Sequence, residues 1–304
     1  MMPVEKEQEV YVMLKDGIGG LCMALADSVP GVSGGTIAFI LGFYDQFIGS
    51  INDLVFGKKE KKKAAIFYLA KLGMGWVVGM ALAVLALSAL FESHIYGISS
   101  LFIGFIAGSI PLIIKEEKDS LREVGKGVVF GLLGMLLVVG ITWLNGRVGA
   151  GSMDLSSFTP ILGIKLFLIG MVAISAMFLP GISGSTLLLI FGAYIPIISA
   201  IRGFMGLHFS YLPALMFFGF GVLAGAVTVV RGIKVCLDKF RPQMVYAILG
   251  MMIGSFYAII QGPATLDVPK AAMSFGNFQI TASLIGVLLV LGMQIIKEKS
   301  RKEA

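Results

Sequence analysis

The chain has 304 residues, of which 57% are hydrophobic and only 14% are charged. Soluble domains carry about 25% charged residues, so this composition excludes a water-soluble fold. The net charge is +6, but the basic residues cluster at the ends of apolar runs, which argues for membrane loops and against nucleic-acid binding. Two cysteines far apart predict neither a disulfide framework nor a metal cluster.

The first half of the chain, residues 1–145, is predicted to form a broken pair of short helices and then three membrane spans. The broken pair covers about residues 10–51, because Pro30–Gly35 interrupts an apolar stretch. The limb after the break, residues 36–51, would give about 24 Å of helix, which is too short for a full crossing. The three spans are expected at 65–90, 96–114 and 124–144.

The second half, residues 146–304, repeats this plan. Pro30–Thr36 (PGVSGGT) recurs as Pro180–Thr186 (PGISGST), and ten of 22 positions are identical when residues 30–51 are aligned with 180–201. The second broken pair covers 158–201, and its spans are expected at 211–230, 243–260 and 277–296. Glycines also match at an offset of 146, which indicates a duplication. The predicted fold class is an all-α polytopic membrane protein.

The distribution of Lys and Arg predicts that the two halves are inverted relative to each other. Four segments are rich in basic residues, at 58–63, 115–126, 231–241 and 297–302. They fall on one side if each broken pair enters and leaves by the same face, and that side is cytoplasmic by the positive-inside rule. Both chain termini are then cytoplasmic. The broken pairs are interpreted as re-entrant hairpins whose tips meet near the midplane, although two full crossings would give the same sidedness.

The two breaks are the candidate binding site. Ser33 and Ser183 are expected to cap the following helices, whose free N–H groups and positive dipole ends would attract phosphate or carboxylate. Matched breaks in two halves of an apolar chain are typical of transporter binding sites. The alternative is close helix packing with a kink. The candidate residues are Ser33, Gly34, Gly35, Thr36, Ser183, Gly184, Ser185 and Thr186.

Charged residues inside apolar segments are costly and usually functional, so they are further candidates. Lys15 and Lys165 occupy equivalent places in the two repeats and suit an anionic ligand, although Lys15 could also extend to the headgroups. Lys71 and Arg202 are additional candidates for phosphate contact. Asp27, just before the first break, is a candidate for H⁺ or Na⁺ coupling or for pairing with a lysine. No other cofactor is expected.

No nucleotide-binding loop, zinc-ligand spacing or catalytic triad is recognisable, which argues against an enzyme. An ion-coupled carrier of a small soluble anion would use the same breaks. A membrane lipid phosphatase or transferase is a third alternative.

The segments Ala26–Ala38 and Leu179–Thr186 resemble the prokaryotic polyprenyl-phosphate transporter family, long catalogued as a domain of unknown function. The resemblance covers essentially the whole chain. It implies a flippase that returns undecaprenyl phosphate, the lipid carrier of cell-wall precursors, from the outer to the inner leaflet of the cytoplasmic membrane. The lipid phosphate would then be the partner, bound by alternating access while its prenyl tail stays in lipid.

Overall fold

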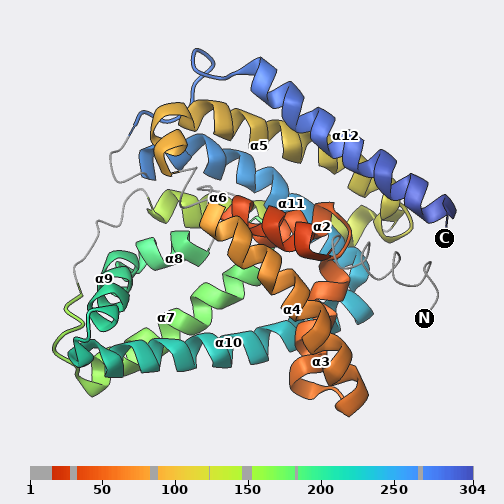
Figure 1. Cartoon of the computed structure of the whole chain (residues 1–304). Helices are drawn as coiled ribbons and strands as arrows, with labels where there is room; N and C mark the ends of the chain where they lie inside the picture. Colours follow the sequence, from red (N-terminus) through yellow and green to blue (C-terminus); the bar gives the residue numbers. More distant parts are fainter. Residues whose placement is uncertain are drawn as a thin grey trace, which may run out of the picture.

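The computed structural model describes residues 16–27, 33–82, 88–122, 124–145, 153–181, 184–265 and 270–303. Residues 16–27 are helical, and within the described ranges there are helices and no β-strand (Figure 1). The remaining α-helices are α2 (Gly34–Ile40), α3 (Tyr44–Phe56), α4 (Lys59–Leu82), α5 (Ser88–Glu116), α6 (Val124–Asn145), α7 (Pro160–Phe178), α8 (Gly184–Ile190), α9 (Tyr194–Met205), α10 (Leu212–Lys239), α11 (Arg241–Gln261) and α12 (Ile280–Glu303). Short 3-10 turns lie at η2 (Ser120–Arg122), η3 (Phe209–Tyr211) and η4 (Gly262–Thr265).

The long helices have the length and composition of membrane spans. By these two measures, α4, α5, α6, α7, α10 and α11 can each cross a membrane, and α12 contributes the shorter apolar stretch Ile280–Gly292. Large apolar side chains point outward from several of them, including Phe67, Val129, Leu133 and Leu288. Such faces are stable in lipid and unfavourable in water. The chain is therefore a multi-pass helical membrane protein, as the composition predicted.

The helices lie near the predicted spans but begin and end at other residues. The segment predicted as one span at 65–90 includes most of α4 and also the start of α5 at Ser88. The span predicted at 211–230 extends to Lys239 in α10, because the basic segment that follows favours helix and continues it beyond the apolar stretch. The span predicted at 96–114 lies within α5, whose backbone is non-helical at His94. The segment at 158–179 forms the 19-residue α7, which is long enough for a full crossing.

The segment after each break differs from the prediction. We expected one helix over 36–51 and another over its copy, but each is divided by a turn. Gly42 (φ 75°) and Gly192 (φ 64°) adopt the left-handed conformation that ends a helix. In the first copy the turn is closed by a 3.0 Å hydrogen bond from Phe43 N to Ala38 O. Each repeat therefore places a seven-residue helix (α2 or α8) directly after its break.

Within each repeat, the helix before the break packs parallel to the first long helix after it. A side chain at Gly75 would collide with the Gly17 carbonyl, and one at Gly79 with the Leu21 carbonyl. The second repeat has the same register, because Gly221 faces Phe167 and Gly225 faces Met171. The equivalent glycines in the sequence thus make equivalent contacts. Since the two helices of each pair run in the same direction, the chain between them must return to the end where the first helix began.

The other long helices pair across the repeats. α6 packs along α11, and α5 packs along α12 (Figure 1). Both pairs are parallel and closely matched, because Gly250 lies against Gly131 and Gly104 lies against Ser283. Each half therefore supplies helices that pack against helices of the other half.

Candidate functional site

The two breaks lie in contact, although 145 residues separate them in the chain. The Thr36 hydroxyl oxygen accepts a 2.7 Å hydrogen bond from the Gly181 N–H, and the Tyr44 hydroxyl donates a 2.8 Å bond to the Phe178 carbonyl. The Ser33 hydroxyl points at the Leu179 carbonyl at 3.4 Å. We call this region the junction, defined as residues 33–36, Tyr44 and 178–181.

The start of α2 follows from its sequence. Ser33 has an extended backbone (φ −126°, ψ 140°), and its hydroxyl oxygen accepts a 3.1 Å bond from the Gly35 N–H. This is the N-cap predicted for Ser33. A side chain at Gly35 would crowd the Phe178 carbonyl, so glycine here allows the two breaks to approach closely.

Asp27 supplies the second acceptor at the start of α2. Its Oδ1 accepts a 2.7 Å bond from the Gly34 N–H, and its Oδ2 accepts a 3.1 Å bond from the indole nitrogen of Trp76 on α4. The carboxylate therefore joins the first break to the first long helix. It also occupies the Gly34 amide, one of the groups that the sequence predicted to be available for an external anion.

The cations predicted for the site lie elsewhere along the helices. Lys165 is exposed near the start of α7, about 20 Å along the helix axis from the break at its other end. Lys71 is half-buried on α4 with its ammonium nitrogen 4.1 Å from the centre of the Phe67 ring. Lys165 is therefore far from the junction, and the contact of Lys71 with Phe67 does not involve it. Lys15 and Ser183 lie outside the described residues, as do the side chains of Ser185, Thr186 and Arg202.

Two residues that contact the breaks, Ser255 and Trp76, were not predicted. Ser255 on α11 is buried, and its hydroxyl donates a 2.9 Å bond to the Met251 carbonyl and points at the Gly181 carbonyl at 3.4 Å. Gly181 itself has φ +87°, a conformation that other residues rarely adopt. A serine within an apolar helix was a usable signal for Ser255. Trp76 offered none, because tryptophan is common in membrane helices.

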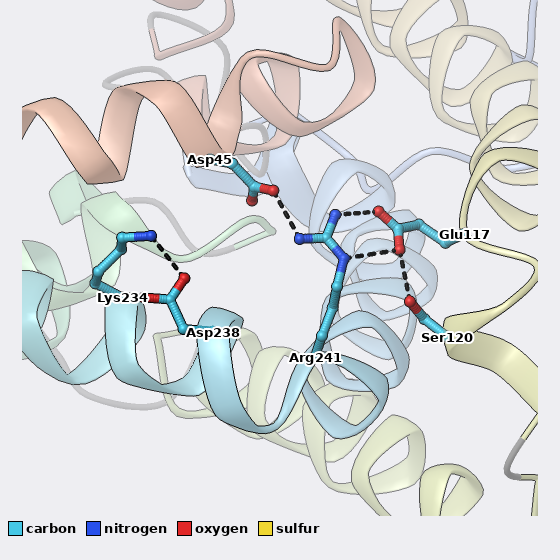
Figure 2. A network of polar contacts seen from close by, with 6 residues as sticks. All are labelled: Asp45, Glu117, Ser120, Lys234, Asp238 and Arg241. Atoms are coloured by element: carbon cyan, nitrogen blue, oxygen red, sulfur yellow. Dashed lines mark hydrogen bonds and ion pairs between the residues drawn. The ribbon is translucent and has the colours of Figure 1, made fainter.

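A cluster of charges lies at one end of the bundle. Arg241, the first residue of α11, donates from NH1 to Asp45 at 2.7 Å and from Nε to Glu117 at 3.1 Å (Figure 2). Its NH2 group also bonds to Glu117. Ser120 donates to the same Glu117 carboxylate at 2.8 Å. Burial raises the pKa of Glu117, but the bonds from Arg241 and Ser120 outweigh this and hold it below the usual value.

This cluster lines a pocket of about 200 Å³ that extends towards the junction. Its apolar wall is formed by Phe39, Gly42, Tyr44 and Ile113. Tyr44 belongs both to this wall and to the junction, so the pocket and the meeting point of the breaks share a side chain. From the sequence, Arg241 is predicted only as one of the basic residues of a loop. Asp45, a carboxylate within the apolar segment 36–51, was the signal that could have identified the cluster.

Comparison with known proteins identifies relatives along most of the chain. Residues 23–276 match the family model described as undecaprenyl phosphate translocase-like. A polyprenyl-phosphate transporter of Staphylococcus aureus is 35% identical over 250 residues, which cover 81% of this chain and 86% of that protein. A polyprenyl-phosphate transporter of Vibrio cholerae serotype O1 is 29% identical over 314 aligned positions, covering 92% and 96%. No solved structure matches the chain significantly.

Proposed function

The chain belongs to the undecaprenyl phosphate translocase-like family, and from this premise we propose that it transports a polyprenyl phosphate lipid from the outer to the inner leaflet of the cytoplasmic membrane. The family resemblance drawn from the two motifs is confirmed. The protein is a transporter and not an enzyme, in agreement with the names of its relatives. The observation that carries the proposal is the contact between the two breaks, which brings polar backbone and hydroxyl groups together inside an apolar bundle.

The proposed topology is an inverted repeat with cytoplasmic termini, in which each broken pair enters and leaves by the same face. The parallel packing of α7 with α10 supports it, because α8 and α9 must then carry the chain back towards the side where α7 begins. Arg231 contacts Phe56, which lies next to the basic segment 58–63. Arg241 contacts Glu117, which lies in the basic segment 115–126. Both arginines belong to the basic segment 231–241, so these three segments lie at one end of the molecule. Basic segments collected at one end favour a cytoplasmic location for that end.

Cysteine labelling tests this topology directly. In a chain with Cys22 and Cys236 replaced by alanine, Ser156→Cys should react with a membrane-impermeant reagent from outside the cell. Asp119→Cys should react only after the inner face is exposed. Labelling of both positions from the same side would overturn the inverted arrangement.

The phosphate headgroup is proposed to bind at the junction while the prenyl tail remains in lipid. Ser33–Thr36 and the equivalent Ser183–Thr186 would contribute N–H and hydroxyl donors, and alternating access would expose the junction to one leaflet at a time. The bonds from Gly181 to Thr36 and from Tyr44 to Phe178 then join the two units whose separation opens the site. Asp27 is proposed as the coupling group, because H⁺ or Na⁺ would weaken its hold on the Gly34 amide.

In this proposal, the predicted cations lie where the lipid headgroup enters from each face of the membrane. Lys165, exposed near the start of α7, would attract the headgroup at the outer face, and Lys15 would do so at the inner face. Arg202 and Lys71 would serve the same two surfaces. Because Lys165 lies far from the junction, we expect Lys165→Gln to reduce the rate of lipid capture and to leave binding at the junction intact.

The decisive experiment is reconstitution into liposomes with a short-tail polyprenyl phosphate in one leaflet, followed by leaflet-specific detection. The purified chain should equilibrate the lipid between leaflets, and Thr36→Val should slow this exchange. Transport of free phosphate without movement of the lipid would instead favour a carrier of small soluble anions. Release of free phosphate from the lipid would favour a phosphatase.

A further inference from the structure

The guanidinium of Arg241 holds two carboxylates in unequal ways. Glu117 receives bonds from two guanidinium nitrogens and from Ser120, and its side chain is only 16% exposed. Asp45 receives a single bond from NH1, and its side chain is 49% exposed. Two-point contacts with a buried carboxylate are strong, whereas a single exposed ion pair is weak. The bond to Asp45 is therefore the one that breaks more readily.

The two carboxylates also belong to different parts of the fold. Glu117 follows α5, and Arg241 begins α11, so both lie on the long helices that pair across the repeats. Asp45 is the second residue of α3, which belongs to the first broken unit. The Arg241–Asp45 bond thus joins the broken unit to the long helices at one end of the bundle, next to the pocket that leads to Tyr44.

The duplication provides an internal comparison. By the offsets of the repeat, the positions equivalent to Arg241, Asp45 and Glu117 are Ile95, Ile195 and Pro263. All three are apolar, and Ile95 and Pro263 are buried. The charge cluster therefore exists at one end of the duplicated fold and has no equivalent at the other, although the surrounding helices match closely.

We propose that the ion pair between Arg241 and Asp45 is a latch at this end of the transporter, in which Arg241 can exchange Asp45 for another anion. The pocket that both residues line is then a second binding site for the phosphate monoester headgroup. In the latched state NH1 binds Asp45 and keeps the first broken unit against α11. When the headgroup enters the pocket, a phosphate oxygen replaces the Asp45 carboxylate on NH1, while Glu117 keeps the guanidinium in position. This inference rests on the proposed function, because it assumes that a lipid phosphate is the substrate.

The chemistry of the exchange is balanced and specific. One oxyanion replaces another on the same donor, so Arg241 stays paired in both states, and the released Asp45 carboxylate, which is already half exposed, turns to solvent. Guanidinium groups suit both carboxylate and phosphate geometry, which a lysine would not match equally well. Asp45 is thus a competitor of the substrate. Its removal should strengthen phosphate binding, and removal of Arg241 should weaken it.

The test uses the purified full chain in detergent with farnesyl phosphate as the probe and farnesol as the uncharged control. Ile113, which lines the pocket and is buried, is replaced by cysteine in a background without Cys22 and Cys236. The rate at which this cysteine reacts with a polar thiol reagent reports opening of the latch. Protection by farnesyl phosphate reports binding in the pocket.

Two variants that break the same ion pair should behave oppositely. Asp45→Asn should speed labelling and tighten farnesyl phosphate binding by up to about fivefold, the range expected for an exposed pair. Arg241→Gln should also speed labelling but weaken farnesyl phosphate binding by about tenfold or more. Farnesol should protect neither protein. Equal changes in affinity for the two variants, or none, would overturn the latch.

Matched controls separate the latch from general charge effects. Glu116 lines the same pocket and accepts a 3.4 Å bond from Gln294, so Glu116→Gln removes the same charge but leaves the Asp45 bond in place. It should change the affinity less than Asp45→Asn does. Lys234→Gln removes the nearby pair with Asp238 on α10 (Figure 2) and should have no effect.

The outcome is distinguishable from failure of the proposed function. If the wild-type chain moves polyprenyl phosphate between leaflets but Asp45→Asn and Arg241→Gln shift farnesyl phosphate binding equally, only the latch is wrong. If the two variants shift binding in opposite directions while no lipid moves in liposomes, the pocket binds phosphate monoesters and the transport proposal is wrong.

Discussion

Two pairs of equivalent glycines should respond oppositely to substitution by alanine. A Cβ at Gly75 or Gly221 would collide with the backbone carbonyl of the parallel helix, at Gly17 and Phe167 respectively. Two residues earlier, Gly73 and Gly219 have no atom within 4 Å of an added Cβ. Both pairs lie within α4 and α10, so the local helix propensity is the same and only the packing differs.

The expected magnitudes follow from this difference. Alanine at Gly73 or Gly219 should stabilise the helix by up to about 1 kcal/mol, because glycine is the weaker helix former. Alanine at Gly75 or Gly221 gains the same propensity but must push two backbones apart, and overpacking costs about 1–3 kcal/mol. The two kinds of variant should therefore differ by about 1–3 kcal/mol, a factor of about 5 to 150 in the folding equilibrium.

Reversible unfolding of the purified protein in mixed detergent and SDS micelles measures this difference. The Gly75→Ala and Gly221→Ala proteins should unfold at lower SDS fraction than the wild type, and the Gly73→Ala and Gly219→Ala proteins at an equal or higher fraction. If Gly75→Ala is as stable as Gly73→Ala, the parallel packing of residues 16–27 on α4 is wrong. The second repeat provides an independent repetition of the experiment.

Three further predictions concern single polar contacts. Thr36→Val leaves the buried Gly181 N–H without its acceptor and should cost about 1–3 kcal/mol in the same unfolding assay, whereas Thr36→Ser should be closer to the wild type. Asp27→Ala removes the acceptor of the Trp76 indole and should shift the emission maximum of that tryptophan, measured in a Trp143→Phe background; an unchanged spectrum would contradict the contact. The pKa of Glu117 is lowered in the folded protein, so its contribution to stability should be complete above the usual glutamate value of about 4.3 and lost as pH falls through the lower folded pKa. The stability difference between wild type and Glu117→Gln should accordingly shrink on acidification, and a constant difference would refute this assignment.

The long helices could be predicted from the sequence because their signals are local or repeated. Apolar length located α6 and α11 within a few residues. Among the glycines that match at an offset of 146, Gly75 with Gly221 and Gly104 with Gly250 proved to be packing residues, because close approach of two backbones requires the smallest side chain at each contact. In the structure, Gly75 and Gly221 make equivalent contacts with Gly17 and Phe167. A helix-propensity scale treats each residue alone and could not have indicated these contacts.

The turn after each break was missed for a physical reason. Gly42 and Gly192 lie within apolar segments that could continue as helix, and one isolated glycine does not by itself end a helical pattern. Only the positive φ of both residues in the fold identifies them as helix ends. Tyr44 then begins the next helix at the angle that brings its hydroxyl to Phe178.

The two helix breaks were predicted from the sequence, whereas most contacts of the residues around them were not. The motifs identified the breaks, and the capping role of Ser33 followed from residue type. The contacts of Asp27 could not be predicted in this way, because one of its hydrogen-bond donors is Trp76, whose position depends on the three-dimensional fold. Arg241, Asp45 and Glu117 come from three distant parts of the chain, and nothing in one sequence indicates that they meet.

The pairing of α5 with α12 has a consequence for how the protein is made. α12 is synthesised after every other described helix, whereas its partner α5 belongs to the first half and is made before α7 to α11. Until α12 arrives, the surface of α5 around Gly104 and Gly108 has no neighbouring helix to cover its backbone. A chain truncated before Ile280 would therefore lack the helix that packs on this surface of α5. The packing of α5 in the first half is therefore completed only when α12 has been made.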